Sequence, residues 1–532
     1  MTVKLNSATL IKSVSEKIAA NNSSNTTNEY LLFKEFILSI EQNFPVNSWT
    51  FNSIHLWPLI RIRLFFYLVD YTHELNKKLI VDCNQNQTDD HHSSHLNHKP
   101  VQNRVDIKKF ARLKDLISKL KSTLNYYRLK KRIKSKSYLF VGHNEHRINY
   151  KSSLYNRFFD TIIDENNLHD KSYVIEFGER KTESLANSRI IINPKEFLKK
   201  YTEFYFLKQQ YIKLKANVVK LDDYDKFISF LLSNNVTSVF AENYSEAKVR
   251  SLVNYTLAVE FDFYTELLKK INPKKLFVLC YYNDLSLIAA ANKLNIETIE
   301  MQHGAQVDEH LAYGNWSVVP EEGYDYIPRK YWCWDIHSSK VLDCLTSQNK
   351  LYNAFVGGHV WVDYWLQKNE KYLEDDFILY TLQPDCFSIE QLFPQAIISF
   401  IKNESKKWFI RLHPRQLKEL KAIKAYLETL NILSKINIEE ATKDPLPMLL
   451  RSCCIHITNH SSTTIEAALF NKKTVLIHET GKLYYSDIVA EGKAEYIPVN
   501  ENFEAQLKKQ LSMASTAAYR SIEKPFYIKY FT

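Results

Sequence analysis

Four apolar segments decide the fold: FILYTL (377–382), WFIRL (408–412), CIHIT (454–458) and TVLIH (474–478). Helix-length amphipathic segments separate them, including 389–403 and one that begins near Ser462. Short apolar strands that alternate with helices are typical of a parallel α/β sheet. The sequence therefore predicts a Rossmann-like domain over residues 371–500, with any ligand beyond the carboxyl ends of its strands.

A second series of the same kind lies upstream. Its expected strands are YLFVGH (138–143), YVIEF (173–177), RIIIN (189–193), SVFAEN (238–243), LFVLCYY (276–282) and TIEMQH (298–303). The last two flank an amphipathic helix over 284–294. This series predicts another Rossmann-like domain over 137–315, joined to the first by a transition over 316–370. We expect an α/β fold in which the two Rossmann-like domains face a cleft.

The sequence outside these domains divides by composition into four segments: a helical segment over 1–81, a polar flexible linker over 82–106, a basic helix over 107–136, and a C-terminal helix or tail over 501–532. Between Lys108 and Lys136 there are twelve Lys or Arg and one Asp, with apolar residues at roughly helical spacing. This pattern predicts either a helix that rests on anionic lipid or a solvated surface helix. No nucleic-acid module is recognisable elsewhere, so nucleic acid is not an expected partner.

Composition excludes several classes of protein. With 532 residues, 45% hydrophobic and 24% charged, the chain is expected to form a few globular domains. It has only nine glycines, and neither GxGxxG nor GxxxxGK[ST] occurs. Seven cysteines without a CxxC pair argue against a disulfide framework or a zinc site. The N-terminus resembles no signal peptide and no apolar run approaches about 20 residues, so we expect a cytoplasmic protein.

The first candidate site follows the strand 408–412, in the segment RLHPRQ. Pro414 restricts His413 to an extended conformation, so its ring can project from the strand end. An imidazole beside Arg411 and Arg415 suits an anionic phosphate. The alternative is an ordinary strand-to-helix turn with surface cations.

The second candidate site follows the strand 454–458, in the segment NHSSTTIEAALF. Ser461 and Ser462 precede a helix, whose first N–H groups and dipole favour a phosphate. Glu466, one turn inside the helix, can accept hydrogen bonds from ribose hydroxyls. Thr463 and Glu466 also fit a capping box, which needs no ligand. Because a capping box does not account for the two serines, we favour the phosphate site.

The third candidate site ends the strand 298–303, in the segment IEMQHG. Gly304 allows a sharp turn that leaves the imidazole of His303 exposed. An unperturbed histidine titrates near neutrality, which suits a general base acting on an acceptor hydroxyl. A structural histidine is one alternative, and Glu322 before Gly323 is a rival base. Acidic side chains expected on the acceptor side are Asp284, which also fits a helix N-cap, Asp308 and Glu309.

The order of these motifs resembles bacterial GT-B enzymes of surface-polysaccharide assembly. A strand–helix–strand unit ends in Gln-His-Gly, and His-Pro and then a Ser-Ser/Thr turn with a Glu follow. The enzymes that share this order include capsule and lipopolysaccharide sialyltransferases, Kdo transferases, and the CDP-glycerol polyol-phosphate transferases. The resemblance covers about residues 137–500.

The resemblance implies roles for individual residues. In the sialyltransferases the His-Pro and Ser-Ser/Thr motifs hold the nucleotide phosphate, which here implies His413, Ser461 and Ser462. An acidic residue is their base, which implies Glu322. In the polyol-phosphate transferases a His-Gly motif supplies the base, which implies His303. The acidic triplet lies after Gln-His-Gly, and Gln rather than Trp precedes His303, so both bases depart from their family pattern.

We therefore expect a glycosyltransferase that moves a sugar from a nucleotide-activated donor, of the CMP-sialic acid or Kdo type or a UDP-sugar, to a hydroxyl of a surface-polysaccharide or lipid-linked glycan. No DxD-like triplet lies at a strand end, so no metal and no cofactor besides the donor is expected. Alternatives are a CDP-polyol phosphotransferase, a UDP-sugar 2-epimerase-like enzyme, and a non-catalytic scaffold. Residues 108–136 would provide peripheral contact with the inner face of the cytoplasmic membrane.

Overall fold

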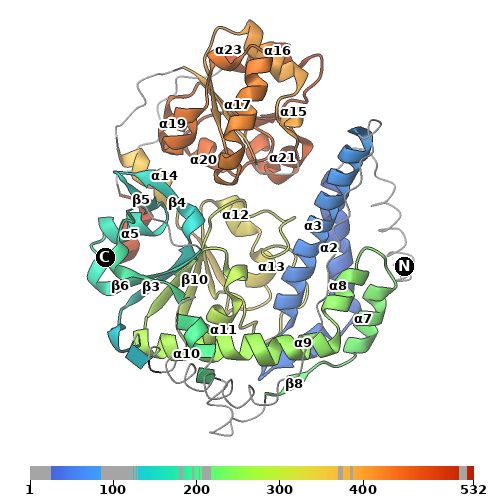
Figure 1. The fold of residues 1–532 in the computed structure, drawn as a ribbon, viewed down its shortest axis with the longest axis vertical. Coiled ribbons are helices and arrows are strands. Elements are labelled where there is room, and N and C mark those ends of the chain that lie inside the picture. The colour runs from blue at the N-terminus through green and yellow to red at the C-terminus, as the bar shows by residue number, and fades with distance from the viewer. Residues whose placement is uncertain are drawn as a thin grey trace, which may run out of the picture.

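The computed structural model describes residues 26–84, 124, 127–128, 130–178, 184–194, 197–202, 204–205, 217–368, 376–383, 387–513 and 524–531. Two α/β domains lie one above the other, with two long N-terminal helices beside them (Figure 1). The expected linker over 82–106 and most of the expected basic helix over 107–136 lie outside the described residues.

The N-terminal domain contains a seven-stranded sheet in the order β12-β11-β10-β9-β3-β6-β7, and every pairing is parallel. Its strands are β3 (Tyr138–His143), β6 (Ser172–Phe177), β7 (Ile191–Ile192), β9 (Lys275–Val278), β10 (Glu297–Met301), β11 (Lys330–Cys333) and β12 (Asn353–Val356). The accompanying helices are α5 (Phe159–Glu165), α7 (Tyr224–Leu232), α8 (Ser238–Asn243), α9 (Glu246–Leu252), α10 (Ala258–Ile271), α11 (Leu285–Lys293), α12 (Ile336–Lys340), α13 (Asp343–Thr346) and α14 (Val360–Gln367). A hairpin of β4 (Arg147–Tyr150) and β5 (Ser153–Asn156) extends from it.

The C-terminal domain contains a six-stranded parallel sheet in the order β15-β14-β13-β16-β17-β18. Its strands are β13 (Ile378–Thr381), β14 (Trp408–Arg411), β15 (Ile436–Asn437), β16 (Ile455–Thr458), β17 (Thr474–Leu476) and β18 (Ala494–Tyr496). The helices are α15 (Ile389–Leu392), α16 (Gln395–Asn403), α17 (Leu420–Thr429), α18 (Glu439–Lys443), α19 (Leu446–Ser452), α20 (Thr463–Leu469), α21 (Glu479–Tyr484), α22 (Ser486–Ala490) and α23 (Phe503–Met513). Every residue of β13 and β16 is buried, as in a sheet covered on both faces. The expected α/β class with two Rossmann-like domains is confirmed.

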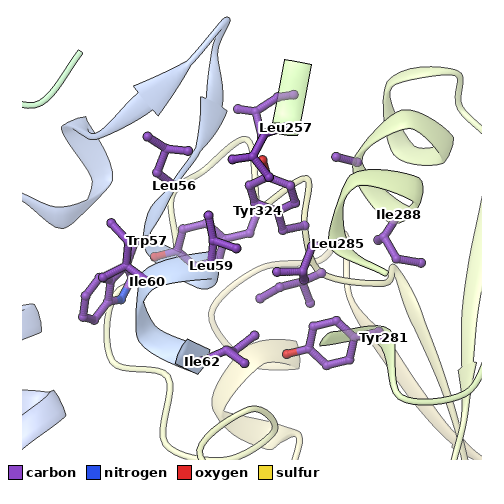
Figure 2. Close-up of a cluster of buried hydrophobic side chains, with 14 of the residues drawn as sticks. Leu56, Trp57, Leu59, Ile60, Ile62, Leu257, Tyr281, Leu285, Ile288 and Tyr324 are labelled. Carbon is purple, nitrogen blue, oxygen red and sulfur yellow. The ribbon is translucent and has the colours of Figure 1, made fainter. Parts of the chain in front are cut away.

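The N-terminal helices are part of the first domain's core. Helices α2 (Thr26–Asn43) and α3 (Trp57–Asn84) flank β1 (Thr50–Phe51) and β2 (Ile54–His55), which pair with β8 (Val219–Lys220). Figure 2 shows side chains from the start of α3, among them Leu59 and Ile60, packed around Tyr324 and toward Leu285. Each fully buried aliphatic side chain contributes about 1.5–3 kcal/mol. The segment expected over 1–81 therefore includes helices that bury their apolar faces against the sheet domain.

Several local expectations were wrong for identifiable reasons. The segment 238–243 forms helix α8 rather than a strand, and helical spacing lets Phe240 stack on Tyr244 one turn later, with ring centroids 4.2 Å apart. The strand expected over 276–282 ends at Val278, since Cys280 adopts a positive φ of 55° and a 3-10 turn follows. Pro394 divides the helix expected over 389–403 into α15 and α16.

The domain boundary also differs from the expectation. The residues assigned to a transition, 316–370, supply β11, β12 and α14, and both strands extend the N-terminal sheet. At the other end of the chain, α24 (Phe526–Phe531) returns to the N-terminal domain, where Phe531 packs against Tyr138 and Phe277. The segment expected as a C-terminal tail thus ties the second domain to the first.

Candidate functional site

The strand orders locate the ligand edges of both sheets. Numbered along the chain within each sheet, the C-terminal order is 3-2-1-4-5-6, and the N-terminal sheet has the same order with a seventh strand. In such sheets the strand order reverses beside the first strand, and ligands bind beyond the carboxyl ends at that point. The reversal lies between β13 and β16 in one domain and between β3 and β9 in the other.

The carboxyl ends of the two sheets meet at one face, called the domain interface below. Arg415, beyond β14, lies with its Nε 4.0 Å from Oε2 of Glu145, beyond β3. Nε2 of His359, beyond β12, lies 3.9 Å from Oε1 of Glu466 in α20. These contacts place the ligand edges of both domains opposite each other.

On the C-terminal domain, Gln383 and His460 join across the strand reversal. Gln383 follows β13, and its Oε1 accepts a hydrogen bond of 2.7 Å from the backbone N–H of His460, which follows β16. The amide of Gln383 also bonds to Nδ1 of His460, at 2.9 Å. Rings of Phe387 and His478 lie 6.2 and 5.7 Å from the His460 ring. Aromatic rings with adjacent amide groups are a suitable environment for a nucleobase.

The expected serines lie at the same edge, and the capping-box alternative does not apply. Helix α20 begins at Thr463 with Ser462 as its N-cap, and no side-chain capping hydrogen bond is present. The hydroxyl of Ser461 lies 3.1 Å from that of Thr463 and accepts its backbone N–H at 3.3 Å. Ser462 is half-buried, and its hydroxyl bonds to no other residue that the structure describes. Ser462 is therefore the hydroxyl best placed to meet a ligand.

The cations of the His-Pro turn are only partly available. Nη1 of Arg411 donates to the carbonyls of Ala441 and Asp444, both at 2.6 Å, and so fixes the end of α18. Burial, with help from the charge of Arg157, lowers the pKa of Arg411 to about 10. Arg411 therefore stabilises the end of α18, and its Nη1 is not available to bind a phosphate.

His413 and its neighbours form a capped turn. Nδ1 of His413 accepts the backbone N–H of Arg415 at 3.2 Å, and Pro414 opens the 3-10 helix Pro414–Glu419. Oε1 of Gln416 completes the cap by accepting the N–H of His413. Arg415 is exposed, and its side chain extends toward Glu145 on the other domain. Of the two arginines in this turn, Arg415 is the one whose side chain is exposed and can reorient to contact a bound anion.

Glu466 is buried where the domains meet. Its side chain is 4% exposed, and Oε2 has no hydrogen-bond partner among the described residues. Burial raises its pKa, while the charges of Arg157 and Arg411 oppose that rise. His359 opposite it caps α14, since its Nδ1 accepts the N–H of Val362 at 3.3 Å, and burial lowers the pKa of His359 well below its ordinary value.

On the N-terminal domain, His143 and Asp284 face each other across the strand reversal. His143 ends β3, and its Nε2 lies 3.8 Å from Oδ2 of Asp284, which follows β9. Asp284 is the N-cap residue of α11, but its side chain makes no capping hydrogen bond. Burial raises the pKa of Asp284, partly offset by His143. A carboxyl with a raised pKa is a stronger base than an ordinary carboxylate.

His303 follows β10, and its ring is half-buried with Nδ1 shielded from solvent, so the expectation of an exposed imidazole was wrong. Its Nε2 lies 2.7 Å from Sγ of Cys280, and its ring lies 5.8 Å from that of His146. Burial, with neighbouring positive groups including Arg157, lowers the pKa of His303 to about 3. Its imidazole is therefore neutral at neutral pH. A base acting through Nδ1 requires the tautomer in which Nε2–H points at the sulfur.

The other acidic candidates differ from one another in burial and in position. Glu309 is half-buried, and burial raises its pKa. Asp308 is exposed, and its carbonyl accepts the side-chain N–H of Asn315 at 2.6 Å. Glu322 is 69% exposed and lies 3.3 Å from His55. Because its loop packs on Asn349 and Tyr352, just before β12, Glu322 lies at the amino edge of the sheet, away from the domain interface.

Arg157 is a site residue that no sequence motif marked. It lies between β5 and α5, held by Asn156, whose Oδ1 accepts the N–H groups of Phe158 and Phe159. Its Nε is buried without a hydrogen-bond partner among the described residues. After burial itself, its charge contributes to the lowered pKa values of His303, on one domain, and Arg411, on the other. A cation whose field reaches both domains suits a ligand with phosphate groups.

His143, Gln383 and His460 were missed for a different reason. His143 ends one expected strand, Gln383 directly follows another, and His460 comes two residues after a third, so the sequence contained a signal of position. The strand order that brings His143 to Asp284, and Gln383 to His460, was not available from the sequence. Among the described residues no three His, Cys, Asp or Glu side chains cluster as a metal site would require. The same ranges contain no helix with the length and apolar character needed to cross a bilayer.

Comparison with known proteins gives fold-level likeness alone. No family model and no curated protein matches the chain. Among solved structures, the Methanocaldococcus jannaschii UDP-GlcNAc 2-epimerase in complex with UDP-GlcNAc and UDP aligns with 74% of this chain and 98% of its own, at 13% identity and a TM-score of 0.42. The Neisseria meningitidis UDP-GlcNAc 2-epimerase bound to UDP-GlcNAc covers 74% and 97%, at 15% and 0.41. The glycosyltransferase SnogD from Streptomyces nogalater covers 72% and 91%, at 11% and 0.36. Values this low carry no information about substrate or activity.

Proposed function

We propose that this chain is an enzyme of nucleotide-activated sugars, and specifically a glycosyltransferase that moves the sugar to a hydroxyl of a glycan acceptor. The observation that carries the proposal is the pair of opposed strand reversals at the domain interface. One presents Gln383, His460 and Ser462, and the other presents His143 and Asp284. A substrate with a nucleotide at one end and a reacting sugar at the other fits such an arrangement.

The nucleotide belongs on the C-terminal domain in this proposal. The amide of Gln383 and the rings around His460 would hold the base. The hydroxyl of Ser462 would bind a phosphate oxygen, since the first N–H groups of α20, those of Thr463, Thr464 and Ile465, already donate to Ser461 and Ser462. Arg157 and Arg415 would offset the negative charge that develops on the leaving phosphate.

The acceptor hydroxyl would lose its proton to the N-terminal edge. His303 is a weak base in the free protein, because its pKa is about 3. A phosphate bound beside it favours the imidazolium and raises that pKa. Asp284, which faces His143, is the second base candidate. The role of Glu322 as a base does not enter the proposal, because it lies at the other edge of the sheet.

Two alternatives involve the same nucleotide site. A polyol-phosphate transferase would use a CDP-linked donor. An epimerase, the activity named for the two epimerase structures above, would change the sugar without an acceptor. Inverting C2 breaks its C–H bond, so an epimerase incubated in D2O with its UDP-sugar would introduce deuterium at C2.

The proposal is tested by a thermal-shift screen of CMP, CDP, UDP and GDP on the full chain. A ligand at about one hundred times its Kd stabilises the folded state by about 2.7 kcal/mol. We expect one nucleotide to stabilise the wild type, and Gln383→Ala and Ser462→Ala to reduce that shift. Ser512→Ala, an exposed serine of α23, is the matched control and should respond like the wild type. If none of the four nucleotides stabilises the protein, the assignment fails.

A further inference from the structure

A pocket lies outside the domain interface, between α3, α8 and the turn that follows β9. It is an open pocket of about 400 Å³, a volume within the range of roughly 300–1,000 Å³ that small-molecule sites occupy. Helices α3 and α8 stand beside each other at the edge of the N-terminal domain (Figure 1). Its lining residues come from these three elements: Ile62, Arg63, Phe66, Tyr67, Asp70, Phe240, Asn243, Tyr244, Tyr282 and Asn283.

Aromatic rings form two walls of the pocket. On one side Phe66 packs against Tyr282, with ring centroids 5.3 Å apart. On the other side Phe240 stacks on Tyr244 at 4.2 Å, and Tyr67 lies 5.5 Å from Phe240. Phe240 is only 2% exposed and supports Tyr244 from behind, whereas the other four rings are half-buried. Since the rings are held by one another, they are ordered before any ligand arrives, which lowers the entropy cost of binding.

The polar lining is balanced in charge. Arg63 and Asp70 supply one positive and one negative group, and Asn243 and Asn283 supply amides. Arg63 is oriented by a hydrogen bond of 2.9 Å from its Nη1 to the hydroxyl of Tyr244. A phosphate or a polycation would favour a lining of one sign, whereas a neutral ligand with many hydroxyls can use both donors and acceptors.

The pocket borders the reacting centre of the proposed function. Tyr282 contacts Phe66 in the pocket, and its ring also lies 6.4 Å from the ring of His303. Asn283 precedes Asp284, which faces His143 at the strand reversal. One short turn therefore contributes two residues to the pocket and adjoins both base candidates.

We infer that this pocket binds the glycan acceptor, with a sugar ring stacked on the aromatic walls and its hydroxyls bonded to Asp70, Asn243 and Arg63. The inference rests on the proposed function and adds the place of the acceptor. Sugar rings have apolar C–H faces that pack on aromatic rings and an edge of hydroxyls that needs planar polar partners. This pocket offers aromatic rings and polar side chains, and it is separated from the domain interface by the short turn that follows β9.

The test measures binding of the full chain to a printed array of bacterial surface oligosaccharides. We expect the wild type to bind at least one glycan, and Phe66→Leu and Asp70→Asn to weaken that binding tenfold or more. Asp70 is exposed, so its variant keeps the test valid if Phe66→Leu fails to fold. Matched controls outside the pocket are Phe230→Leu in α7 and Glu35→Gln in α2, which should bind like the wild type.

Nucleotide thermal shifts of the same variants separate this inference from the proposed function. The pocket variants should keep the wild-type nucleotide shift, because the nucleotide edge lies on the other domain. The inference is overturned if the wild type binds no printed glycan, or if both pocket variants bind as the wild type does. If glycan binding depends on the pocket but no nucleotide stabilises the wild type, the pocket stands and the proposed function fails.

Discussion

His456 in β16 provides a quantitative test of the buried C-terminal core. Its side chain is 0% exposed, and its two ring nitrogens lie 2.9 Å from the hydroxyl of Thr381 and 3.0 Å from that of Thr474. A neutral imidazole satisfies both hydroxyls, with one nitrogen donating and the other accepting. Burial lowers the pKa of His456 to about 3, so the folded protein leaves it uncharged at pH 5.5.

The sign and size of the pH effect follow from linkage. In the unfolded chain the imidazole has a pKa of about 6.5 and takes up a proton as the pH falls below that value. Between pH 6.5 and 3 the unfolded state therefore binds more protons than the folded state, and the free energy of unfolding decreases as the pH decreases. From pH 7.5 to 5.5 the loss from this residue is about 1.4 kcal/mol.

The variant His456→Gln removes the titrating group and keeps hydrogen-bonding capacity toward both threonines. Urea unfolding of both proteins at pH 7.5 and 5.5 gives the loss of stability for each. The variant should lose about 1.4 kcal/mol less than the wild type, and any cost of the substitution at neutral pH cancels in this comparison. An equal loss in both proteins would show that His456 is not a site of proton uptake on unfolding, and would refute the argument from burial.

Three further predictions concern charged groups. Arg61→Met should lower the free energy of unfolding by about 3–5 kcal/mol, because it leaves Glu41, 2.9 Å away and fully buried, without its cation; a loss below about 1 kcal/mol in a denaturant titration would contradict this. Arg157→Ala should raise the Kd of the stabilising nucleotide about tenfold by calorimetry, while Arg157→Lys keeps part of the affinity; unchanged binding would remove Arg157 from the phosphate site. His337→Gln breaks a 2.7 Å contact with Glu491 between the domains, but both groups are partly exposed, so melting at low salt should reveal at most about 1 kcal/mol and high salt should abolish it.

The sequence predicted which polar residues lie at strand ends better than it predicted what their side chains do. His413 follows its strand as expected, but its Nδ1 caps the next turn. Arg411 also lies at the expected edge, yet two backbone carbonyls occupy its Nη1. Whether a polar side chain at a strand end faces a ligand or the protein depends on neighbours distant in the sequence. Glu322 illustrates the larger error, because its loop leads into a strand and so lies at the opposite edge of the sheet.

Local chemistry alone determined that this protein is built from two α/β series. A strand or an amphipathic helix can be recognised from a short stretch of sequence, because its apolar residues repeat with the period of the β-pleat or of the helical turn. Only the tertiary structure decided the strand order, and with it the pairs His143–Asp284 and Gln383–His460. Strand order depends on which strands pair across long stretches of chain, and the local periodicity of the sequence carries no information about that pairing. The same long-range packing brought Arg157 to the domain interface and laid α3 beside α8.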